Sequence, residues 1–584
     1  MSKKSYFWWL ALLCAVSLLS FLGVTYFHTR GEPREAVVAL SMLNQGNWVL
    51  PTNNGVEIAF KPPFFHWCIA AFSSVLGTVN EMTSRLPSAL GLMAMILVGY
   101  VFFAKRRGAE VAFVAALITL TNFEVHRAGV ACRVDMVLTA MMVISLYQLY
   151  KWGERGLKGL PFWAVLTLSA AFLTKGPTGI VLPCVVPAVF LWIRGVNFFR
   201  IFYKFLMVAL LSCVLPFLWY CAAYSQGGER FLDLVLEENV YRFLGKMTYA
   251  SHENPAYYNV VTVVAGYLPY TLLPIISLFF LKYKKVESRP REWWTRFVAY
   301  IRNMDDARLF SLLSIIIIFT FYCIPKSKRS VYLLPIYPFI AYFLAEFIFY
   351  LRRKHIVAVR IFGSVMAGLS FLLALVFVAV RMDWVPDTIF RGSHAAENIA
   401  YLHALSDTAL SVTDFIVLLV PVIMACWYFI VQHKNQSDNK IVYACIGVVY
   451  TIFFALDGFY QPTVLNVKSD KHVADEIAKI VPEGRLYSYR TDVVEGNRMH
   501  PFTVNFYLGD RMVPFDCFES EDAVVDGYVL MGEDAYNSFI QRYGESYVVT
   551  EIHKFHHRSC DDKRYNNLYR VESIWGLGIV PKIK

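Results

Sequence analysis

The chain has 584 residues, of which 57% are hydrophobic and only 17% are charged, and its mean hydropathy is +0.46. Soluble globular domains carry about 25% charged residues, so this composition excludes an ordinary water-soluble enzyme and indicates a polytopic membrane protein. The net charge of +11 comes mainly from short basic loops, which favours contact with anionic lipid over nucleic-acid binding.

Apolar runs long enough to cross a bilayer, which takes roughly 20 residues, recur through the first 460 residues. Hydropathy over such windows predicts about thirteen spanning helices. They are expected at 6–27, 87–104, 109–122, 135–151, 160–175, 177–194, 202–224, 259–281, 308–323, 330–350, 357–380, 413–432 and 440–460. No small-residue cleavage site follows the first run, so we interpret 1–27 as an uncleaved anchor rather than a signal peptide.

Lysine and arginine gather in alternate loops, as in the run from Lys105 to Arg107. The positive-inside rule makes these loops cytoplasmic. The N-terminus is then cytoplasmic, and an odd number of spans puts the C-terminal part on the periplasmic face. We therefore predict a transmembrane domain over 1–460 and an exported domain over 461–584. The transmembrane domain has two long periplasmic loops, at 28–86 and 225–258.

The first periplasmic loop carries charged residues next to membrane-length apolar sequence. It reads Gly31-Glu32-Pro33-Arg34-Glu35 at its start, has a helical period over 35–43, and breaks at Gly46-Asn47-Trp48. Charge beside hydrocarbon is costly, so such a cluster indicates a polar site rather than lipid-facing structure. Further on, Pro62-Pro63 restricts the backbone after Lys61, which would hold that lysine at a defined depth.

The last part of the chain has the composition of a soluble protein. Strand-like runs at 486–489, 527–531 and 547–550 alternate with helix-like runs at 473–480 and 534–543. This alternation predicts a small α/β domain of ordinary size. Both Cys517 and Cys560 lie in this domain, where an oxidising periplasm would permit a disulfide, and their pairing is left open.

The motifs of the membrane part resemble one family. The pattern is similar to the bacterial branch of the GT-C glycosyltransferases, which includes protein O-mannosyltransferase-like enzymes and the aminoarabinose transferase that modifies lipid A. The resemblance covers about the first 460 residues. The matching motifs are Gly31-Glu32-Pro33-Arg34-Glu35-Ala36, Gly46-Asn47-Trp48, Lys61-Pro62-Pro63, Arg85-Leu86-Pro87, Arg133-Val134-Asp135, Lys175-Gly176-Pro177, the loop from Glu238 to Tyr258, and Pro325-Lys326-Ser327-Lys328-Arg329 with Tyr332.

The resemblance implies a GT-C fold and an enzyme of the bacterial inner membrane. Such an enzyme moves a sugar from a polyprenyl-phosphate donor to an acceptor on the periplasmic face. The implied acceptor is lipid A or another glycolipid, and the alternative is serine or threonine of exported proteins. No nucleic-acid partner and no cofactor are implied.

Transfer of a sugar with inversion needs a base near the acceptor hydroxyl, and a carboxylate beside an apolar wall suits that role. Glu32 matches the acidic residue of the family's first loop, and Asp135 matches an acidic residue of its cavity. The aminoarabinose enzyme has two neighbouring acids where this chain has Gly31-Glu32, so it is left open which of Glu32 and Asp135 takes the proton. The alternatives are a helix N-terminal charge for Glu32 and an interfacial ion pair with Arg133 for Asp135.

The departing polyprenyl phosphate is negatively charged, and cations or hydrogen-bond donors in a low-dielectric site would stabilise it. The competing interpretation for the lysines and arginines is snorkelling to the interface. The resemblance implies a donor-phosphate role for Arg34, Lys61, Arg133, Lys175, Arg242, His252, Lys326, Lys328, Arg329 and Tyr332.

A bound metal is not predicted. In the lipid A enzyme the residue before the matching lysine is acidic and is associated with a metal together with a histidine, whereas this chain has Phe60 there. One histidine and scattered acids are not a metal signature. The alternative from a different class is a lipid-linked sugar transporter or flippase, which is disfavoured because neither inverted repeats nor midplane charges are evident.

Overall fold

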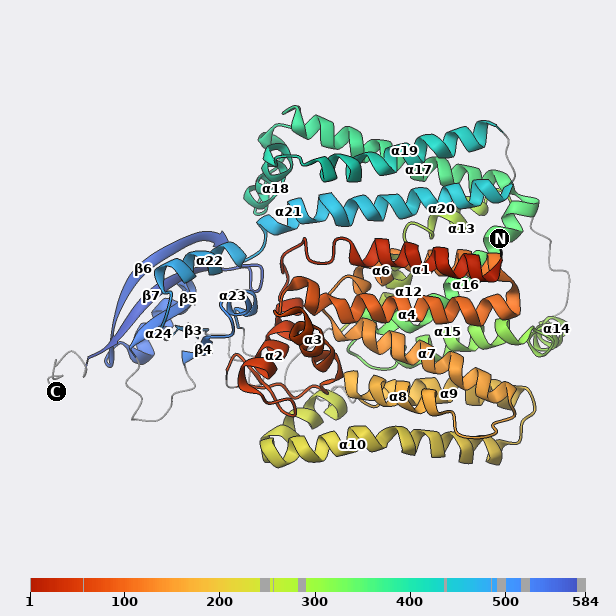
Figure 1. Ribbon diagram of the computed structural model, residues 1–584, viewed down its shortest axis with the longest axis horizontal. Helices are drawn as coiled ribbons and strands as arrows, with labels where there is room; N and C mark the ends of the chain where they lie inside the picture. Colours follow the sequence, from red (N-terminus) through yellow and green to blue (C-terminus); the bar gives the residue numbers. More distant parts are fainter. Residues whose placement is uncertain are drawn as a thin grey trace.

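The computed structural model describes the chain in nine stretches. They are 2–55, 57–241, 253–255, 257–281, 290–434, 438–484, 486–490, 500–515 and 526–574. Long helices run side by side and form most of the molecule, and a small sheet domain lies at one end of them (Figure 1). The N-terminus and helix α14 (Pro290–Arg302) lie at the other end.

Among the described residues, seven helical stretches are long and apolar enough to cross a membrane. They are α4 (Glu81–Arg107), α10 with η1 (Phe198–Tyr241), α15 (Asp306–Cys323), η2 with α16 (Ser330–Lys354), α17 (Ile356–Arg381), α19 (Val412–His433) and α20 to α21 (Asp438–Val467). The pair α5 (Ala109–Leu120) and α6 (Phe123–Gly129), bent by 69°, makes an eighth if it is one span. The chain is therefore a multi-pass membrane protein, and the total of thirteen spans stays a prediction.

The remaining helices of the membrane part fill the bundle and its ends. They are α1 (Lys3–Leu19), α7 (Val134–Glu154), α8 (Phe162–Lys175), α9 (Thr178–Ile193), η3 (Asp387–Ile389) and α18 (Ala395–Asp407). The single span predicted over 259–281 is wrong, because this segment folds as two short helices, α12 (Tyr257–Gly266) and α13 (Leu272–Ser277). Helix α12 ends at Gly266 and Pro269 stands between the two helices, and proline disfavours helical backbone at the residue before it.

The first long loop, residues 28–86, contains two helices and a small hairpin. Helix α2 (Gly31–Gln45) ends where Gly46 adopts a left-handed conformation with φ of 71°, which glycine permits without steric cost. Strands β1 (Thr52–Asn53) and β2 (Glu57–Ile58) follow, and α3 (Phe64–Leu76) begins after Pro63. The predicted break at Gly46 is confirmed.

The C-terminal domain is a five-stranded mixed sheet with helices, as predicted. Strands lie in the order β4-β3-β5-β7-β6, with β3 parallel to β4 and β5 and with β7 antiparallel to both neighbours. The elements are α22 (Lys471–Ile480), β3 (Leu486–Tyr489), α23 (Phe502–Tyr507), β4 (Met512–Pro514), β5 (Gly527–Gly532), α24 (Glu533–Tyr543), β6 (Tyr547–Arg558) and β7 (Tyr565–Ser573). The helical run that precedes this domain, which includes η4 (Leu456–Tyr460) and α21 (Gln461–Val467), continues beyond residue 460.

A buried ion pair joins the first long loop, residues 28–86, to the spanning helices. Arg85 on α4 donates from Nε to Glu32 Oε1 at 2.9 Å and from Nη2 to Oε2 at 3.1 Å. Its Nη1 also donates to the carbonyls of Leu22 and Thr25, which follow the end of α1. Because both side chains are buried, the pair fixes where α2 begins relative to α4.

We predict that Arg85→Leu lowers the free energy of unfolding by roughly 3–5 kcal/mol, because it leaves the Glu32 carboxylate buried and unpaired. The matched control is Arg570→Leu, which removes a half-exposed arginine that pairs with Glu572 on the surface of β7, and it should change stability by less than about 1 kcal/mol. Thermal unfolding in detergent measures both variants. Equal melting temperatures for the two would contradict the prediction.

Candidate functional site

Charged side chains from five elements meet at the end of the bundle that faces the C-terminal domain. At their centre Glu35 of α2 accepts hydrogen bonds from Lys61 Nζ at 2.6 Å and Arg34 Nη2 at 2.8 Å. His66 of α3 lies with Nε2 at 2.9 Å from the second oxygen of Glu35. Both Glu35 and His66 are buried. One carboxylate therefore holds three basic side chains in place.

This arrangement sets the protonation of Glu35 and Lys61 in opposite ways. Burial alone would raise the pKa of Glu35, but Lys61, Arg34 and His66 outweigh it and hold the pKa well below its usual range. Burial and the neighbouring charge of Arg34 lower the pKa of Lys61 to about 8, although Glu35 opposes them. Glu35 is thus an ionised counter-ion, and Lys61 is a cation that loses its proton in mildly alkaline solution.

A second pair lies at the start of α7. Asp135 accepts a hydrogen bond at Oδ1 from Lys175 Nζ, at the end of α8. The Lys175 ammonium also lies 4.6 Å from the ring centre of Tyr332, a distance that permits a cation–π interaction. No hydrogen bond to Asp135 Oδ2 occurs among the described residues.

The two pairs belong to one electrostatic unit. Arg34 interacts with Asp135 and Glu238, Lys61 interacts with Glu238, and Asp135 interacts with Arg133 and Arg329. The unit includes lysines, arginines, a histidine and carboxylates. Its basic members include Arg34, Lys61, His66, Arg133, Lys175 and Arg329, and its acidic members include Glu35, Asp135 and Glu238.

The charges of this unit are also layered by depth. The side chains of Arg34, Lys61 and Lys175 are 36%, 32% and 30% exposed, whereas those of Glu35 and Asp135 are 4% and 9% exposed. A ligand that approaches therefore meets cations first, with the carboxylates beneath them. Such a surface suits an anion.

Glu32, predicted as a candidate base, has a different environment. Arg85 contacts both of its oxygens, and the backbone N–H of Cys132 donates to Oε1 at 2.8 Å. Burial alone would raise the pKa of Glu32, but Arg85 outweighs it and lowers the pKa. These contacts fit a carboxylate that anchors the start of α2 better than one that accepts a proton from a substrate.

Gly31 has a specific role next to Glu32. A Cβ atom at this position would lie 2.3 Å from Nη2 of Arg133, and real Cβ atoms do not approach other atoms so closely. The Arg133 guanidinium therefore occupies the space that a side chain at residue 31 would need. The absence of a second acid at this position brings an additional cation close to the site.

The other predicted phosphate contacts lie in the loop between α15 and η2 or outside the described residues. Lys326 is exposed, and the buried Lys328 donates from Nζ to the carbonyl of Pro325 at 2.7 Å. Arg242 and His252 lie outside the described residues. The roles of these four residues stay predictions.

Two residues of the central cluster, Glu35 and His66, were not singled out from the sequence. The spacing of Glu32 and Glu35 contained a usable indication, because residues three apart share one face of a helix. Both lie on the face of α2 that also buries Ala36 and Ala39. Two acids on an otherwise apolar face require partners, and here the partners are Arg85 for one and Lys61 for the other.

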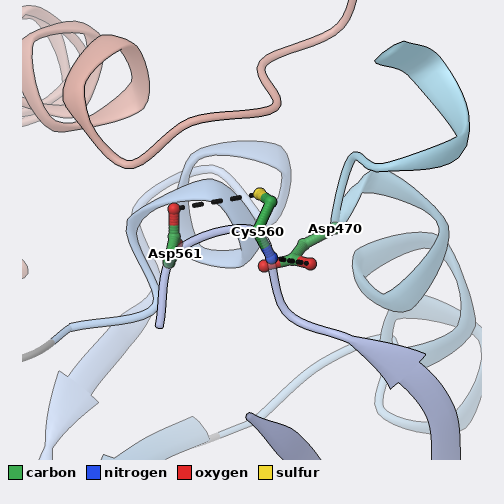
Figure 2. A group of neighbouring side chains, drawn as sticks. All are labelled: Asp470, Cys560 and Asp561. Carbon is green, nitrogen blue, oxygen red and sulfur yellow. Dashed lines mark hydrogen bonds between the residues drawn. The ribbon is translucent and has the colours of Figure 1, made fainter. Parts of the chain in front are cut away.

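Around Lys61, the described residues include no group of three ligating side chains with metal-ligand spacing. Phe60 packs in an apolar cluster with Leu50, Trp219 and Phe231, so the position before the lysine offers no ligand atom. In the described part of the chain, the acids and the thiol of Asp470, Cys560 and Asp561 form the single group with metal-ligand spacing. This group lies in the C-terminal domain (Figure 2).

Hydrogen bonds already occupy the acids of that group. Asp470 accepts from the Cys560 backbone N–H at 2.9 Å and from the Ser559 hydroxyl at 2.7 Å, and Asp561 accepts from both the N–H and the hydroxyl of Thr503 at 2.8 Å. We interpret the group as a joint between backbone segments. Cys560 is a free buried thiol that contacts Thr503, and Cys517, its predicted partner, lies outside the described residues.

Comparison with known proteins identifies similar sequences. The family model described as dolichyl-phosphate-mannose-protein mannosyltransferase matches residues 60–220. An undecaprenyl phosphate-alpha-4-amino-4-deoxy-L-arabinose arabinosyl transferase of Pseudomonas savastanoi is 28% identical over 387 residues, which are 64% of this chain and 67% of that protein. The corresponding transferase of Shewanella sediminis is 26% identical over 62% of each chain. A protein of Aquifex aeolicus is 29% identical over 58% of this chain and 63% of its own. The matches thus span about two thirds of these relatives.

The fold is also found in solved structures. The crystal structure of ArnT from Cupriavidus metallidurans in the apo state superposes with a TM-score of 0.69 and 18% sequence identity, and it covers 97% of this chain and 98% of that one. The same protein bound to undecaprenyl phosphate gives a TM-score of 0.67 and 19% identity, with the same coverage. These matches establish a common fold over almost the whole chain, including the C-terminal domain. The chain therefore shares the fold of ArnT, and its sequence is similar to that of these transferases over about three fifths of its length.

Proposed function

We propose that this protein transfers a sugar from a polyprenyl-phosphate donor to an acceptor at the periplasmic face of the bacterial inner membrane. The observation that carries the proposal is the layered charge of the site, with partly exposed Arg34, Lys61 and Lys175 above the buried Glu35 and Asp135. The site lies at one end of the apolar helices (Figure 1). A lipid-linked phosphate in a bilayer reaches such an end with its chain still in the membrane.

The charge balance suits both the donor and the product. A polyprenyl-phosphate sugar is a phosphodiester with one negative charge, and the released polyprenyl phosphate is a monoester that gains a second. The members named above include more lysine and arginine side chains than carboxylates. Cations positioned in a poorly solvated site stabilise the charge that develops as the glycosidic bond breaks.

We assign the role of base to Asp135 rather than to Glu32. Asp135 accepts the proton of the acceptor hydroxyl while the acceptor oxygen bonds to the anomeric carbon and the bond to the phosphate oxygen breaks. Lys175 holds Oδ1, and Oδ2 has no hydrogen bond from the described residues. Glu32 has Arg85 on both oxygens, which supports an anchoring role.

The preferred acceptor is lipid A or another glycolipid, because several relatives are named as aminoarabinose transferases. Hydroxyl groups of exported proteins are the second candidate, and the match of residues 60–220 to a protein mannosyltransferase family favours them. A flippase is less well supported, because the charged residues of the site belong to the first loop, to the start of α7 and to the end of α8. The opposite end carries α14, whose Arg296 and Trp294 suit a cytoplasmic interface.

The function is tested by mass spectrometry of lipid A and of exported glycopeptides from cells that lack the protein. Cells complemented with wild type are compared with cells complemented with Asp135→Asn. A sugar-sized mass that returns on lipid A only with wild type supports the glycolipid acceptor, and the same result on glycopeptides supports the protein acceptor. No difference in either fraction would reject the transferase.

We predict that Asp135→Asn lowers the rate of transfer by roughly 10² to 10⁴-fold, the usual contribution of a general base. Binding of undecaprenyl phosphate should persist or tighten, because the variant removes a negative charge. The control is Asp387→Asn, which changes a half-exposed aspartate paired with His403 away from the site. Transfer by Asp135→Asn at the rate of this control would exclude Asp135 as the base.

We predict that affinity for undecaprenyl phosphate falls as pH rises through about 8, the lowered pKa of Lys61, because the neutral amine no longer attracts phosphate. If only the protonated form binds, affinity falls about tenfold from pH 7 to pH 9. The phosphate only gains negative charge over this range, so a fall reports on the protein. Lys61→Arg should remove it, and a wild-type affinity that stays constant would refute the assignment.

A further inference from the structure

We infer that the C-terminal domain is a positioning element of the donor site, in which Asn505 holds the β1–β2 hairpin and thereby places Lys61 on Glu35. The inference rests on the proposed function for its catalytic meaning, because it concerns the phosphate contact of Lys61. Asn505 touches neither Lys61 nor Glu35 in the hydrogen bonds described here, so its effect passes through the hairpin.

Helix α23 of the C-terminal domain packs into the junction between the first loop and the spanning helices. The Phe506 ring lies 4.9 Å from that of Phe27 and shares a buried cluster with Val37 of α2. The Tyr507 hydroxyl accepts from the Phe27 N–H at 3.0 Å and donates to Glu81 of α4 at 2.6 Å. The short helix α23 therefore contacts three parts of the membrane domain, namely Phe27, α2 and α4.

The turn of the hairpin is enclosed by the same domain. Asn505 donates from Nδ2 to Asn54 Oδ1 at 2.9 Å and to Asp510 at 2.8 Å, while its Oδ1 accepts from the Met512 N–H at 2.9 Å. Both asparagines are almost fully buried. Next to this bond, His500 Nε2 lies 3.0 Å from Glu57 Oε1. The C-terminal domain thus contacts the hairpin at its turn, through Asn54, and at its second strand, through Glu57.

The hairpin needs this support. Each of its strands has two residues, and an isolated two-stranded hairpin is marginally stable at best in water. On its other side Thr52 contacts Ser41 of α2 at 2.9 Å. The hairpin is therefore held between α2, which carries Glu35, and the C-terminal domain.

The distance from the hairpin to the site is short. β2 ends at Ile58, and Lys61 follows three residues later. The Ala59 N–H donates to the Pro51 carbonyl at 3.0 Å, so the backbone that leads to Lys61 is still tied to the hairpin. A tilt of the hairpin would pull Lys61 Nζ away from Glu35, which it contacts at 2.6 Å.

The base of α23 is fixed within its own domain, which suits a rigid support. Asp561 accepts both hydrogen bonds from Thr503 at the start of α23, and Asp470 accepts from the Ser559 hydroxyl. Figure 2 shows the hydrogen bond from the Cys560 backbone N–H to Asp470. Ser469 then donates to the Phe27 carbonyl at 2.6 Å. These hydrogen bonds connect α22, α23 and the β6–β7 turn to the backbone at Phe27.

The test compares Asn505→Ala and Asn54→Gly, alone and together, in the full-length protein in nanodiscs. Glycine suits position 54 because this residue has φ of 53°, which glycine adopts without strain. The control is Asn537→Ala, at an exposed position on α24. The readouts are undecaprenyl phosphate binding, hydrogen exchange of residues 52–61, and transfer at saturating donor.

Asn54→Gly should weaken undecaprenyl phosphate binding by roughly threefold to tenfold, the effect of one buried hydrogen bond, and should speed hydrogen exchange of the hairpin. Asn505→Ala should weaken binding at least as much, because it also removes the bonds with Asp510 and Met512. The double variant should bind no more weakly than Asn505→Ala alone, because that change already removes the bond to Asn54. Transfer at saturating donor should stay within about twofold, and a structural defect alone would not separate binding from turnover in this way.

Unchanged binding in both single variants, or hairpin exchange equal to that of the Asn537→Ala control, would overturn the inference. So would a double variant whose loss of binding is the product of the two single losses. Failure of the proposed function is distinguishable, because wild type itself would then transfer no sugar, whereas the hydrogen exchange of the hairpin still tests the contact.

Discussion

The buried pair of Glu32 and Arg85 is the interaction on which the rest of the site depends. Arg85 lies on a spanning helix. It binds both the carboxylate at the start of α2 and the carbonyls of Leu22 and Thr25, which follow α1. A buried charge without a partner is strongly destabilising, so this geometry is closely constrained. Because α2 starts at a fixed place, Glu35 one turn later faces the same interior.

The second constraint is the charge balance around Glu35. A single buried carboxylate holds Lys61, Arg34 and His66, which come from different parts of the first loop. Without that carboxylate the cations would repel one another in a poorly solvated space. The ordinary rule that buried charges are paired thus also produces a surface rich in positive charge, because the carboxylates lie deeper than the cations.

The C-terminal domain also holds the first loop in place, through contacts with Asn54 and Glu81. Its contacts with the first loop are buried and specific, including Asn505 with Asn54 and Tyr507 with Glu81. The joint formed by Asp470 and Asp561 consists of satisfied hydrogen bonds rather than vacant ligand positions. The domain therefore stabilises a loop whose own secondary structure is too short to hold its shape.

Much of the architecture follows from local sequence. Apolar length indicates spanning helices, Gly46 ends α2 because glycine tolerates a left-handed residue, and the alternating runs after residue 460 predict the sheet domain. Local sequence also singles out Lys61 through the two prolines that follow it, whereas Asp135 is a candidate because of the family resemblance. Local patterns fail where proline and glycine break an apolar run, as between α12 and α13, and they leave the number of spans open.

The partners of each charge are a matter of tertiary structure, since a sequence pattern cannot tell which of two nearby acids will meet which cation. Glu32 and Glu35 are three residues apart on one helix, yet one pairs with Arg85 and the other with Lys61, because different segments pack against successive turns. Likewise, Arg133 reaches the space beside Gly31 only after α2 and α7 come together. Composition and local pattern determine that charged groups lie beside the membrane, and long-range packing decides which of them remains open to a substrate.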